Sequence, residues 1–181
     1  MAENETFQYD VVDTPIGPLA LVVDEKGAMH LLSFDGESDR WRRQFAQRHP
    51  DAKLVARRDP FGHATALKAY FAGDMQALDG IAVVFGGTPF QNKVWKQLRR
   101  IPVGQTMSYG SLARKIGEPK AMRAVGLANG SNPVVVVVPC HRVIGSDGSL
   151  TGFGGGLPRK KWLLEHEAKH TRAGFRLEAA E

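Results

Sequence analysis

The sequence predicts an α+β protein in two parts, a small antiparallel sheet with helices followed by a mainly helical domain with a helix-turn-helix. Three observations predict this division. Short apolar and β-branched runs separated by turn residues fill the start of the chain. Apolar residues at helical spacing follow from Pro89 onward. The net charge is −4 over residues 1–87, with 9 Lys or Arg and 13 Asp or Glu, and +9 over residues 88–181, with 15 and 6.

The bulk composition is that of an ordinary globular protein, with 43% hydrophobic and 24% charged residues in a chain of 181. No apolar run approaches the ~20 residues that span a bilayer, and the polar, acidic start of the chain does not resemble a signal peptide. A single cysteine excludes an internal disulfide and a cysteine-cluster zinc site. We therefore expect a cytoplasmic protein with no metal, no cofactor and no membrane partner.

The first part, residues 1–87, is predicted to be a structural domain. Turn residues at Pro15–Pro18 and Asp24–Gly27 separate its first apolar runs, which favours an antiparallel meander. No segment in it carries recognisable chemistry. Composition and charge change together at Gly86–Pro89, the expected domain boundary. The expected elements are three strands, two helices and a last short strand: residues 7–12, 19–23, 29–34, 38–48, 62–72 and 81–85.

The second part, residues 88–170, is predicted to bind a polyanion, because it is basic; a solvated basic surface is the alternative. Two short helices joined by a Gly-containing turn suggest a helix-turn-helix. Five consecutive valines, Val134–Val138, favour a strand buried on both faces. Residues 171–181 are expected to be a loosely held tail. The other expected elements are helices at residues 89–100, 109–116, 120–128 and 158–169 and a hairpin at residues 143–150.

Cys140 is the candidate reactive residue, since it follows the buried strand directly and precedes His141 and Arg142. A nearby histidine and positive charge can lower the pKa of a thiol and favour the nucleophilic thiolate. Neighbours on a strand point to opposite faces, so His141 can assist only if the chain turns at this place or a water intervenes. The alternative is that Cys140 is a small buried hydrophobe.

The segment Val138-Pro139-Cys140-His141-Arg142-Val143-Ile144 matches, at each position, the active-site signature of the O6-alkylguanine-DNA alkyltransferases, also called methylated-DNA–protein-cysteine methyltransferases. The resemblance extends with the family's spacing over residues 88–167. It is looser over residues 1–87, where Thr14–Leu19 carries it. The resemblance implies a ribonuclease H-like first domain and a winged-helix-like second domain. It also implies direct DNA repair, in which an alkyl group moves irreversibly from O6 of guanine to Cys140.

The resemblance assigns the catalytic residues one by one. A chain that includes a water runs from Glu167 through His141 to Cys140, with His141 as the base. A carboxylate that orients a histidine follows the logic of a catalytic triad. Tyr109, a phenol protonated at neutral pH, donates a proton to the leaving guanine. Asn132 holds the turn around the cysteine.

The resemblance also implies that the target base leaves the duplex and that Arg123 fills the gap. Small residues along the same helix, Ala121, Ala124 and Gly126, suit a minor groove about 6 Å wide. The further DNA contacts are Lys120, Tyr109 and Ser146. Additional lysines and an arginine could bind phosphates independently of sequence: Lys93, Lys96, Arg114 and Lys115.

The pocket for the flipped base is assigned to Arg142, Val143, Phe153 and Gly154. The loop Thr151–Gly156 lacks the spacing of a nucleotide-binding motif, and in the family it forms a wall of this pocket. Phe153 replaces the usual tyrosine, and Gly154 replaces a frequent serine or alanine. The preference among alkyl groups is therefore open.

The expected partner is double-stranded DNA containing O6-alkylguanine, with O4-alkylthymine a less certain substrate. The protein is expected to be a monomer in solution, and cooperative binding along DNA stays open. Three other classes remain as alternatives: an alkyltransferase-like protein that binds lesions without transfer, a helix-turn-helix DNA-binding regulator and a Cys–His hydrolase. The first lacks the active cysteine, the second does not explain Cys140 with His141 and Glu167, and the third would turn over repeatedly.

Overall fold

The computed structural model describes residues 4–171, 176 and 177. The chain forms two compact units. The first contains residues 1–86 together with 133–137, and the second contains residues 87–132 and 138–181. The return of residues 133–137 to the first unit has no counterpart in the sequence-based division at residue 87. The loosely held tail expected at residues 171–181 lies mostly outside the described residues. Thr171 is described, and residues 176–177 form a short strand.

The first unit is built on a four-stranded sheet with the order β3-β2-β1-β4. Strands β1 (Thr6–Val12), β2 (Leu19–Val23) and β3 (Met29–Ser33) pair antiparallel, which confirms the predicted meander. Strand β4 (Lys53–Ala56) pairs with β1 in parallel. All five residues of β2 are buried, as expected for a central strand covered on both faces.

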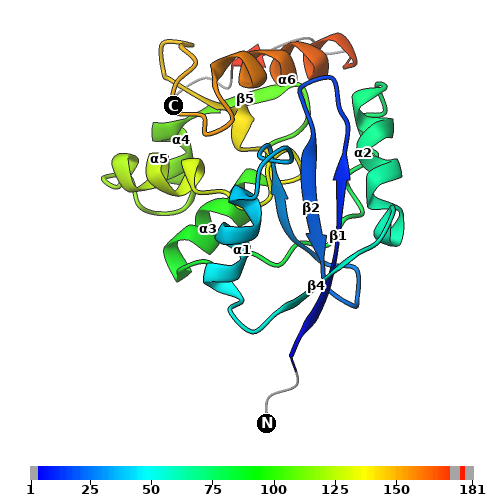
Figure 1. Ribbon diagram of the computed structural model, residues 1–181. Helices are drawn as coiled ribbons and strands as arrows, with labels where there is room; N and C mark the ends of the chain where they lie inside the picture. Colours follow the sequence, from blue (N-terminus) through cyan, green and yellow to red (C-terminus); the bar gives the residue numbers. More distant parts are fainter. Residues whose placement is uncertain (1–3, 172–175, 178–181) are drawn as a thin grey trace. The chain divides into compact units, whose positions relative to one another are not determined.

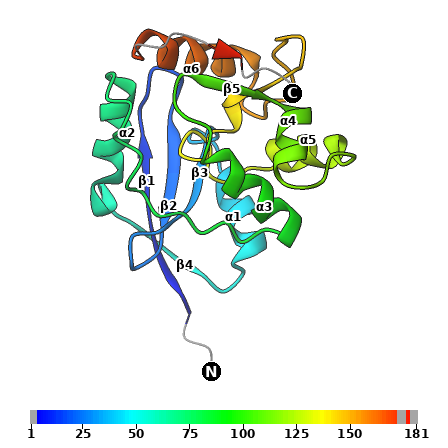
Figure 2. The same ribbon diagram turned by 180° about the vertical axis from the view of Figure 1, so that it is seen from behind.

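Two helices complete this unit. Helix α1 (Arg40–Arg48) lies between β3 and β4 in the chain, and its Trp41 and Phe45 pack in one apolar cluster with Phe7. Helix α2 (His63–Phe71) runs alongside β1 in both views, after the 3₁₀ turn η1 (Pro60–Gly62) (Figures 1 and 2). Both helices were predicted within two residues of their observed ends. Burying the aromatic and aliphatic side chains of the cluster stabilises the fold at roughly 25 cal/mol per Å².

The sequence prediction was wrong at two places in the first unit. Residues 81–85 do not form a strand; Val83 makes only an isolated parallel bridge with Met29. The four-residue strand β4 was missed. Its partner β1 is more than 40 positions earlier in the chain, so no local hairpin signal marks it.

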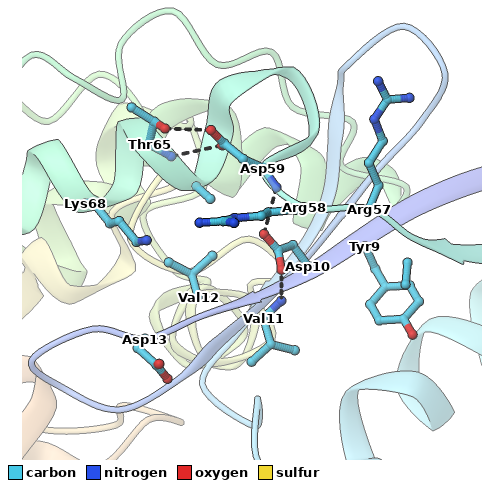
Figure 3. A pocket seen from close by; sticks show the side chains of 12 residues that line it. Tyr9, Asp10, Val11, Val12, Asp13, Arg57, Arg58, Asp59, Thr65 and Lys68 are labelled. Atoms are coloured by element: carbon cyan, nitrogen blue, oxygen red, sulfur yellow. Dashed lines mark hydrogen bonds between the residues drawn. The ribbon is translucent and has the colours of Figure 1, made fainter.

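A surface pocket of about 680 Å³ lies in the first unit, between β1 and the start of α2 (Figure 3). Two of its acidic side chains, Asp10 and Asp59, hold the local backbone in place. Asp10 accepts hydrogen bonds from the backbone N–H groups of Val11 and Asp59, and Asp59 accepts from the backbone N–H and the hydroxyl of Thr65 (Figure 3). Asp59 thereby satisfies a donor in the first turn of α2. None of the predicted site residues lines this pocket.

The second unit begins with three helices at the predicted places. They are α3 (Pro89–Leu98), α4 (Tyr109–Lys115) and α5 (Met122–Gly130). Thr88 and Gln91 form a capping box at the start of α3, and Ser108 caps α4 by accepting from the backbone N–H of Ser111. Trp95 Nε1 of α3 donates to the Ala128 carbonyl of α5 at 2.7 Å, which joins these two helices.

The predicted valine strand is absent. Residues 134–138 are buried or partly buried, but they make only isolated bridges and turns. Val136 has a φ of 69°, which a β-branched residue rarely adopts, and the backbone N–H of Val137 donates to the carbonyl of Val135 across it. Such a conformation costs about 1–3 kcal/mol, so the surrounding packing must hold it.

The predicted hairpin at residues 143–150 is also absent. Strand β6 (Val143–Ile144) pairs in parallel with β5 (Gln105–Ser108), and β5 pairs in parallel with β7 (Arg176–Leu177). Residues 145–149 form a turn closed by backbone hydrogen bonds. Helix α6 (Leu157–Lys169), predicted within one residue, lies alongside β5 in both views (Figures 1 and 2).

Candidate active site

Cys140 and His141 lie on a single turn of 3₁₀ helix, η2 (Cys140–Arg142). Pro139 precedes this turn with an N-cap conformation of φ −83° and ψ 64°. The chain therefore turns at the place where an extended strand would have sent the two side chains to opposite faces. Both residues are buried, Cys140 with 4% of its surface exposed and His141 with none.

His141 is held by the last helix of the second unit. Its Nε2 lies 2.7 Å from Oε1 of Glu167, which is 1% exposed. Burial alone would raise the pKa of Glu167, but His141 and Arg142 outweigh it and hold this pKa well below its usual range. Burial lowers the pKa of His141, against the pull of Glu167. The pair is therefore a neutral imidazole beside a carboxylate, with the imidazole proton on Nε2.

The other nitrogen of His141, Nδ1, is buried and has no hydrogen-bond partner among the described residues. With the proton on Nε2, Nδ1 carries a lone pair that can accept a proton. A buried polar atom without a partner is uncommon, and functional sites are one place where it occurs. In this arrangement His141 has a buried nitrogen that is able to accept a proton.

Arg142, predicted to line the base pocket, directs its side chain toward Glu167. Its Nε donates to Oε2 of Glu167 at 2.9 Å and its Nη2 to Oε1 at 2.8 Å, while Nη1 donates to the Ile101 carbonyl at 2.7 Å. This bidentate pair orients the carboxylate that holds His141. The role of Arg142 in the base pocket stays a prediction.

The thiol of Cys140 differs from the sequence-based expectation of a lowered pKa. Burial raises its pKa, although a hydrogen bond with Asn132 and the charge of Lys160 act in the opposite direction. The resting group is therefore a thiol, and a base must remove its proton before the sulfur can attack. This finding makes the lone pair on His141 more important than the sequence alone indicated.

Two asparagines support the turn that carries Cys140. Asn132 donates from Nδ2 to the Val138 carbonyl at 2.7 Å, close to its predicted place around the cysteine. Asn129, which the sequence analysis did not single out, is buried on α5 and donates to the carbonyl of Cys140 itself at 3.3 Å. Its only sequence signal is a polar residue on the apolar side of a short helix.

Tyr109 begins α4 and is half-buried. Its hydroxyl donates to the Thr151 carbonyl at 3.0 Å, and burial raises its pKa, so the phenol stays protonated at neutral pH. Gly152 has a φ of 61°, and a side chain there would approach the hydroxyl of Tyr109 to 3.2 Å. Tyr109 thus lies beside the glycine-rich loop, where a proton donor for a leaving base is expected.

One side of α5 is exposed. Arg123 and Ala124 are open to solvent, Lys120 precedes the helix and is also exposed, and Ala121 and Gly126 are partly buried. Val125, Ala128 and Asn129 are buried on the opposite side. Of the predicted DNA-contact residues in this segment, Lys120, Arg123 and Ala124 are therefore accessible, and Ala121 and Gly126 are only partly so. Ser146 is exposed in the turn after β6.

Lys160, which the sequence analysis missed, lies close to Tyr109 and to two of the predicted pocket residues, Val143 and Phe153. Lys160 of α6 is fully buried, and its ammonium lies 5.9 Å from the ring centroids of Tyr109 and Phe153. Val143 is buried, whereas Gly154 is exposed. A lysine in a helix predicts exposure, so no sequence signal marked Lys160.

Neither a metal centre nor a membrane span is apparent in the part of the chain that the structure describes. No group of three or more His, Cys, Asp or Glu side chains there could hold a metal ion. None of the helices in the same residues is long and apolar enough to cross a membrane.

Comparison with known proteins identifies the family. The sequence model described as "6-O-methylguanine DNA methyltransferase, DNA binding domain" matches residues 89–169. Methylated-DNA–protein-cysteine methyltransferase of Salmonella typhimurium is 47% identical over 158 residues, covering 86% of this chain and 92% of the relative. The chain belongs to the methylated-DNA–protein-cysteine methyltransferase family. Its relative in Mycolicibacterium paratuberculosis is 44% identical over 171 residues, covering 94% and 98% of the two chains.

Solved structures of this methyltransferase family share the fold. The O6-methylguanine methyltransferase of Mycobacterium tuberculosis has a TM-score of 0.75 with 41% identity, covering 92% of this chain and 96% of its own. The Mycobacterium tuberculosis protein OGT in complex with DNA has a TM-score of 0.73 with 40% identity, covering 93% and 96%. These matches show the mixed α+β architecture of the family.

Proposed function

We propose that the protein repairs DNA directly, by moving an alkyl group from O6 of guanine in duplex DNA to Sγ of Cys140. The buried group formed by Cys140, His141 and Glu167 carries the proposal, because it supplies a nucleophile, a base and a carboxylate that orients the base. The relatives are named as methyltransferases that modify a protein cysteine, and this chain has only one cysteine.

The proposed reaction balances without a cofactor. The thiol proton moves to Nδ1 of His141, directly or through a water, and the imidazolium is stabilised by Glu167. The sulfur electron pair forms a bond to the alkyl carbon while the bond from that carbon to O6 breaks. Tyr109 donates a proton to the leaving guanine, and solvent later returns a proton to Tyr109 and removes one from His141. The thioether product is stable, so each chain reacts once.

The exposed face of α5 is proposed to bind the minor groove, with Arg123 in the space left by the flipped nucleotide. The small residues Ala121, Ala124 and Gly126 let the helix backbone approach the groove, and Lys120 and Ser146 lie at exposed positions suited to DNA contacts. DNA is the bound partner in the solved Mycobacterium tuberculosis complex, which supports this proposal.

Several finer inferences accompany this function. The sheet order β3-β2-β1-β4, with β4 parallel to β1, supports a ribonuclease H-like first unit. Helices α4 and α5, joined by a short turn, support a winged-helix-like, helix-turn-helix second unit. We infer a monomer that acts in the cytoplasm, where a reducing environment keeps the lone thiol available. Val143, Phe153 and Gly154 are proposed as pocket walls, and O4-alkylthymine as a second substrate.

The deciding experiment incubates the protein with a duplex that contains one O6-methylguanine and then measures the intact mass and the modified peptide. We expect a gain of one methyl group per chain, located on Cys140, and no gain for Cys140→Ala. Binding of the duplex without a gain in mass would instead identify a lesion-binding protein that does not transfer. Repeated release of product from one chain would point to a hydrolase.

A further inference from the structure

Lys160 is the buried charged group that the reaction proposed above does not use. It is 0% exposed on α6, whereas the next residue, Lys161, is 67% exposed and pairs with Glu165 at 3.8 Å. Lysine is almost never fully buried unless it is paired, because removing an ammonium from water is costly. A fully buried lysine beside a reactive cysteine therefore requires an explanation.

The contacts of Lys160 all belong to the candidate active site. Its Nζ donates hydrogen bonds to the carbonyls of Val143 and Thr151, the second at 2.9 Å. The ammonium also lies 5.9 Å from the ring centroids of Tyr109 and Phe153. None of these four partners is a carboxylate. The positive charge is therefore not neutralised by a fixed acid at these contacts, and its field extends into the site.

The charge of Lys160 acts on Cys140. Burial lowers the pKa of Lys160 to about 8, even though the negative charge of Cys140 acts in the opposite direction. At neutral pH the group is mainly an ammonium, and its charge lowers the pKa of the Cys140 thiol against the opposing effect of burial. Tyr109 also interacts with the charge of Cys140, but it is a phenol and carries no positive charge. His141, the next residue in the chain, is kept neutral by burial in the resting site.

We propose that Lys160 is a positioning residue for alkyl transfer, whose ammonium stabilises the Cys140 thiolate and holds the carbonyls of Val143 and Thr151 at the reacting pocket. The proposal rests on the function proposed for Cys140. Once the thiol proton has moved to His141, the new negative charge on sulfur and the ammonium of Lys160 attract each other in a site of low dielectric constant. This attraction lowers the free energy of the nucleophile at the moment of attack.

The second part of this role concerns the Thr151 carbonyl, which accepts from both Tyr109 Oη at 3.0 Å and Lys160 Nζ at 2.9 Å. Tyr109 must turn its hydroxyl away from Thr151 to donate a proton to guanine. A carbonyl has two lone pairs, so Lys160 keeps Thr151 bonded when Tyr109 leaves it. The loop that carries Thr151 therefore stays in place during the reaction.

The test compares three substitutions at this position with one matched control. Lys160→Met removes charge and donors at similar length, Lys160→Gln keeps a neutral donor, and Lys160→Arg keeps a charge. The control is Lys161→Met, on the exposed side of the same helix. The first measurement is the pKa of the Cys140 thiol, from the ultraviolet absorbance of the thiolate against pH, with Cys140→Ser subtracted. The second is the single-turnover rate of methyl transfer from duplex DNA against pH.

We expect Lys160→Met and Lys160→Gln to raise the thiol pKa by about one unit and to slow transfer at neutral pH by about tenfold, since a nearby opposite charge shifts a pKa by 1–3 units. The pH at which the transfer rate rises to half of its maximum should increase by the same amount. Lys160→Arg should retain most of the wild-type thiol pKa, and Lys161→Met all of it.

A wild-type thiol pKa and pH–rate profile in Lys160→Gln would overturn the electrostatic role and leave only the carbonyl contacts. If Lys160→Met does not fold, the comparison of Lys160→Gln with Lys160→Arg decides the same question, because both keep a donor. The thiol titration needs no DNA. A shifted thiol pKa together with no methyl transfer by the wild type would therefore refute the proposed function and still support the electrostatic role of Lys160.

Discussion

The buried group around Cys140 and the exposed face of α5 belong to the same unit but are built in opposite ways. Cys140, His141 and Glu167 are 4%, 0% and 1% exposed, whereas Met122 and Leu127 of α5 are 54% and 74% exposed. The first region obtains its protonation states from burial, which favours a neutral imidazole and a protonated thiol. The second obtains its proposed function from accessibility. Substitutions in the first region should therefore reduce both stability and reactivity, and those in the second should reduce only the reaction on duplex DNA.

Glu167→Gln tests the buried region most severely. The change leaves Arg142 without its carboxylate and removes the charge that would stabilise an imidazolium at His141. We expect a loss of about 3 kcal/mol in the free energy of unfolding and about a hundredfold slower methyl transfer. Urea denaturation and single-turnover kinetics measure these quantities. Glu165→Gln, at a 68% exposed position on the same helix, should change neither. Equal effects of the two substitutions would contradict the assigned role of Glu167.

Arg123→Ala tests the exposed region. We expect the transfer rate on duplex DNA to fall about tenfold or more. Extruding a base from the stack costs a few kcal/mol, and without Arg123 no side chain fills the gap and offsets this cost. The reaction with a free O6-alkylguanine base and the free energy of unfolding should stay at the wild-type values. Arg43→Ala removes the same charge from an exposed position on α1 and serves as the control. If the free base loses as much rate as the duplex, Arg123 does not act in base flipping.

The pH dependence of stability distinguishes the buried histidine from the exposed charges. The pKa of His141 is lowered on folding, so below the unfolded value of about 6.5 the unfolded chain binds a proton that the folded chain does not. The stability associated with neutral His141 is fully present above about pH 6.5 and falls by up to about 1.4 kcal/mol per pH unit below it. Urea denaturation at a series of pH values from 7.5 to 5.5 measures this slope. This range extends about one unit to either side of the free histidine pKa of about 6.5.

His141→Gln should flatten that slope. Burial also lowers the pKa of His49, so His49→Gln is needed to separate the two contributions. An unchanged slope in His141→Gln would show that the imidazole is not held neutral in the folded protein.

Gly126→Ala gives the smallest effect and the clearest separation of stability from DNA binding. A Cβ at this position lies 3.9 Å from Cδ1 of Tyr109, an ordinary contact. We expect a gain of about 0.5–1 kcal/mol in the free energy of unfolding, because alanine restricts the unfolded chain more than glycine does. Binding to duplex DNA should weaken at the same time if the helix backbone approaches the groove. Gly130→Ala, at the end of the same helix with open space around it, should leave DNA binding unchanged.

Much of the fold was predictable because its signals are local. Turn residues separate β1, β2 and β3, and capping residues such as Thr88 and Ser108 mark the starts of helices. The parallel strands β4 and β5 were missed, because each has four residues and pairs with a segment distant in the chain. Strand β6 lies where the first arm of a hairpin was predicted, but its partner is β5. The valine run was misread since β propensity depends on context and tertiary packing holds Val136 at a positive φ.

The candidate site was predictable for a different reason. The residues around Cys140 match a family signature, and that match supplied the roles of His141, Glu167, Tyr109 and Asn132 before any geometry was known. Lys160 and Asn129 were not predicted as site residues, because a lysine or an asparagine in a helix gives no sequence signal of burial. The raised pKa of the thiol was not predicted either, since burial outweighs the neighbouring positive charge and burial is a property of the folded chain.

The return of residues 133–137 to the first unit limits how the chain can be divided. The Pro133 carbonyl accepts from the backbone N–H of Leu32 at 2.9 Å, and the backbone N–H of Val135 donates to the Leu32 carbonyl at 3.1 Å. A fragment that begins at residue 88 would retain Cys140, His141 and Glu167. It would lose β3, whose Leu32 makes the backbone hydrogen bonds to residues 133 and 135. Exposed valines next to the nucleophile would favour aggregation. We therefore expect that residues 88–181 cannot be produced as a stable fragment or fused as a separate domain to another protein.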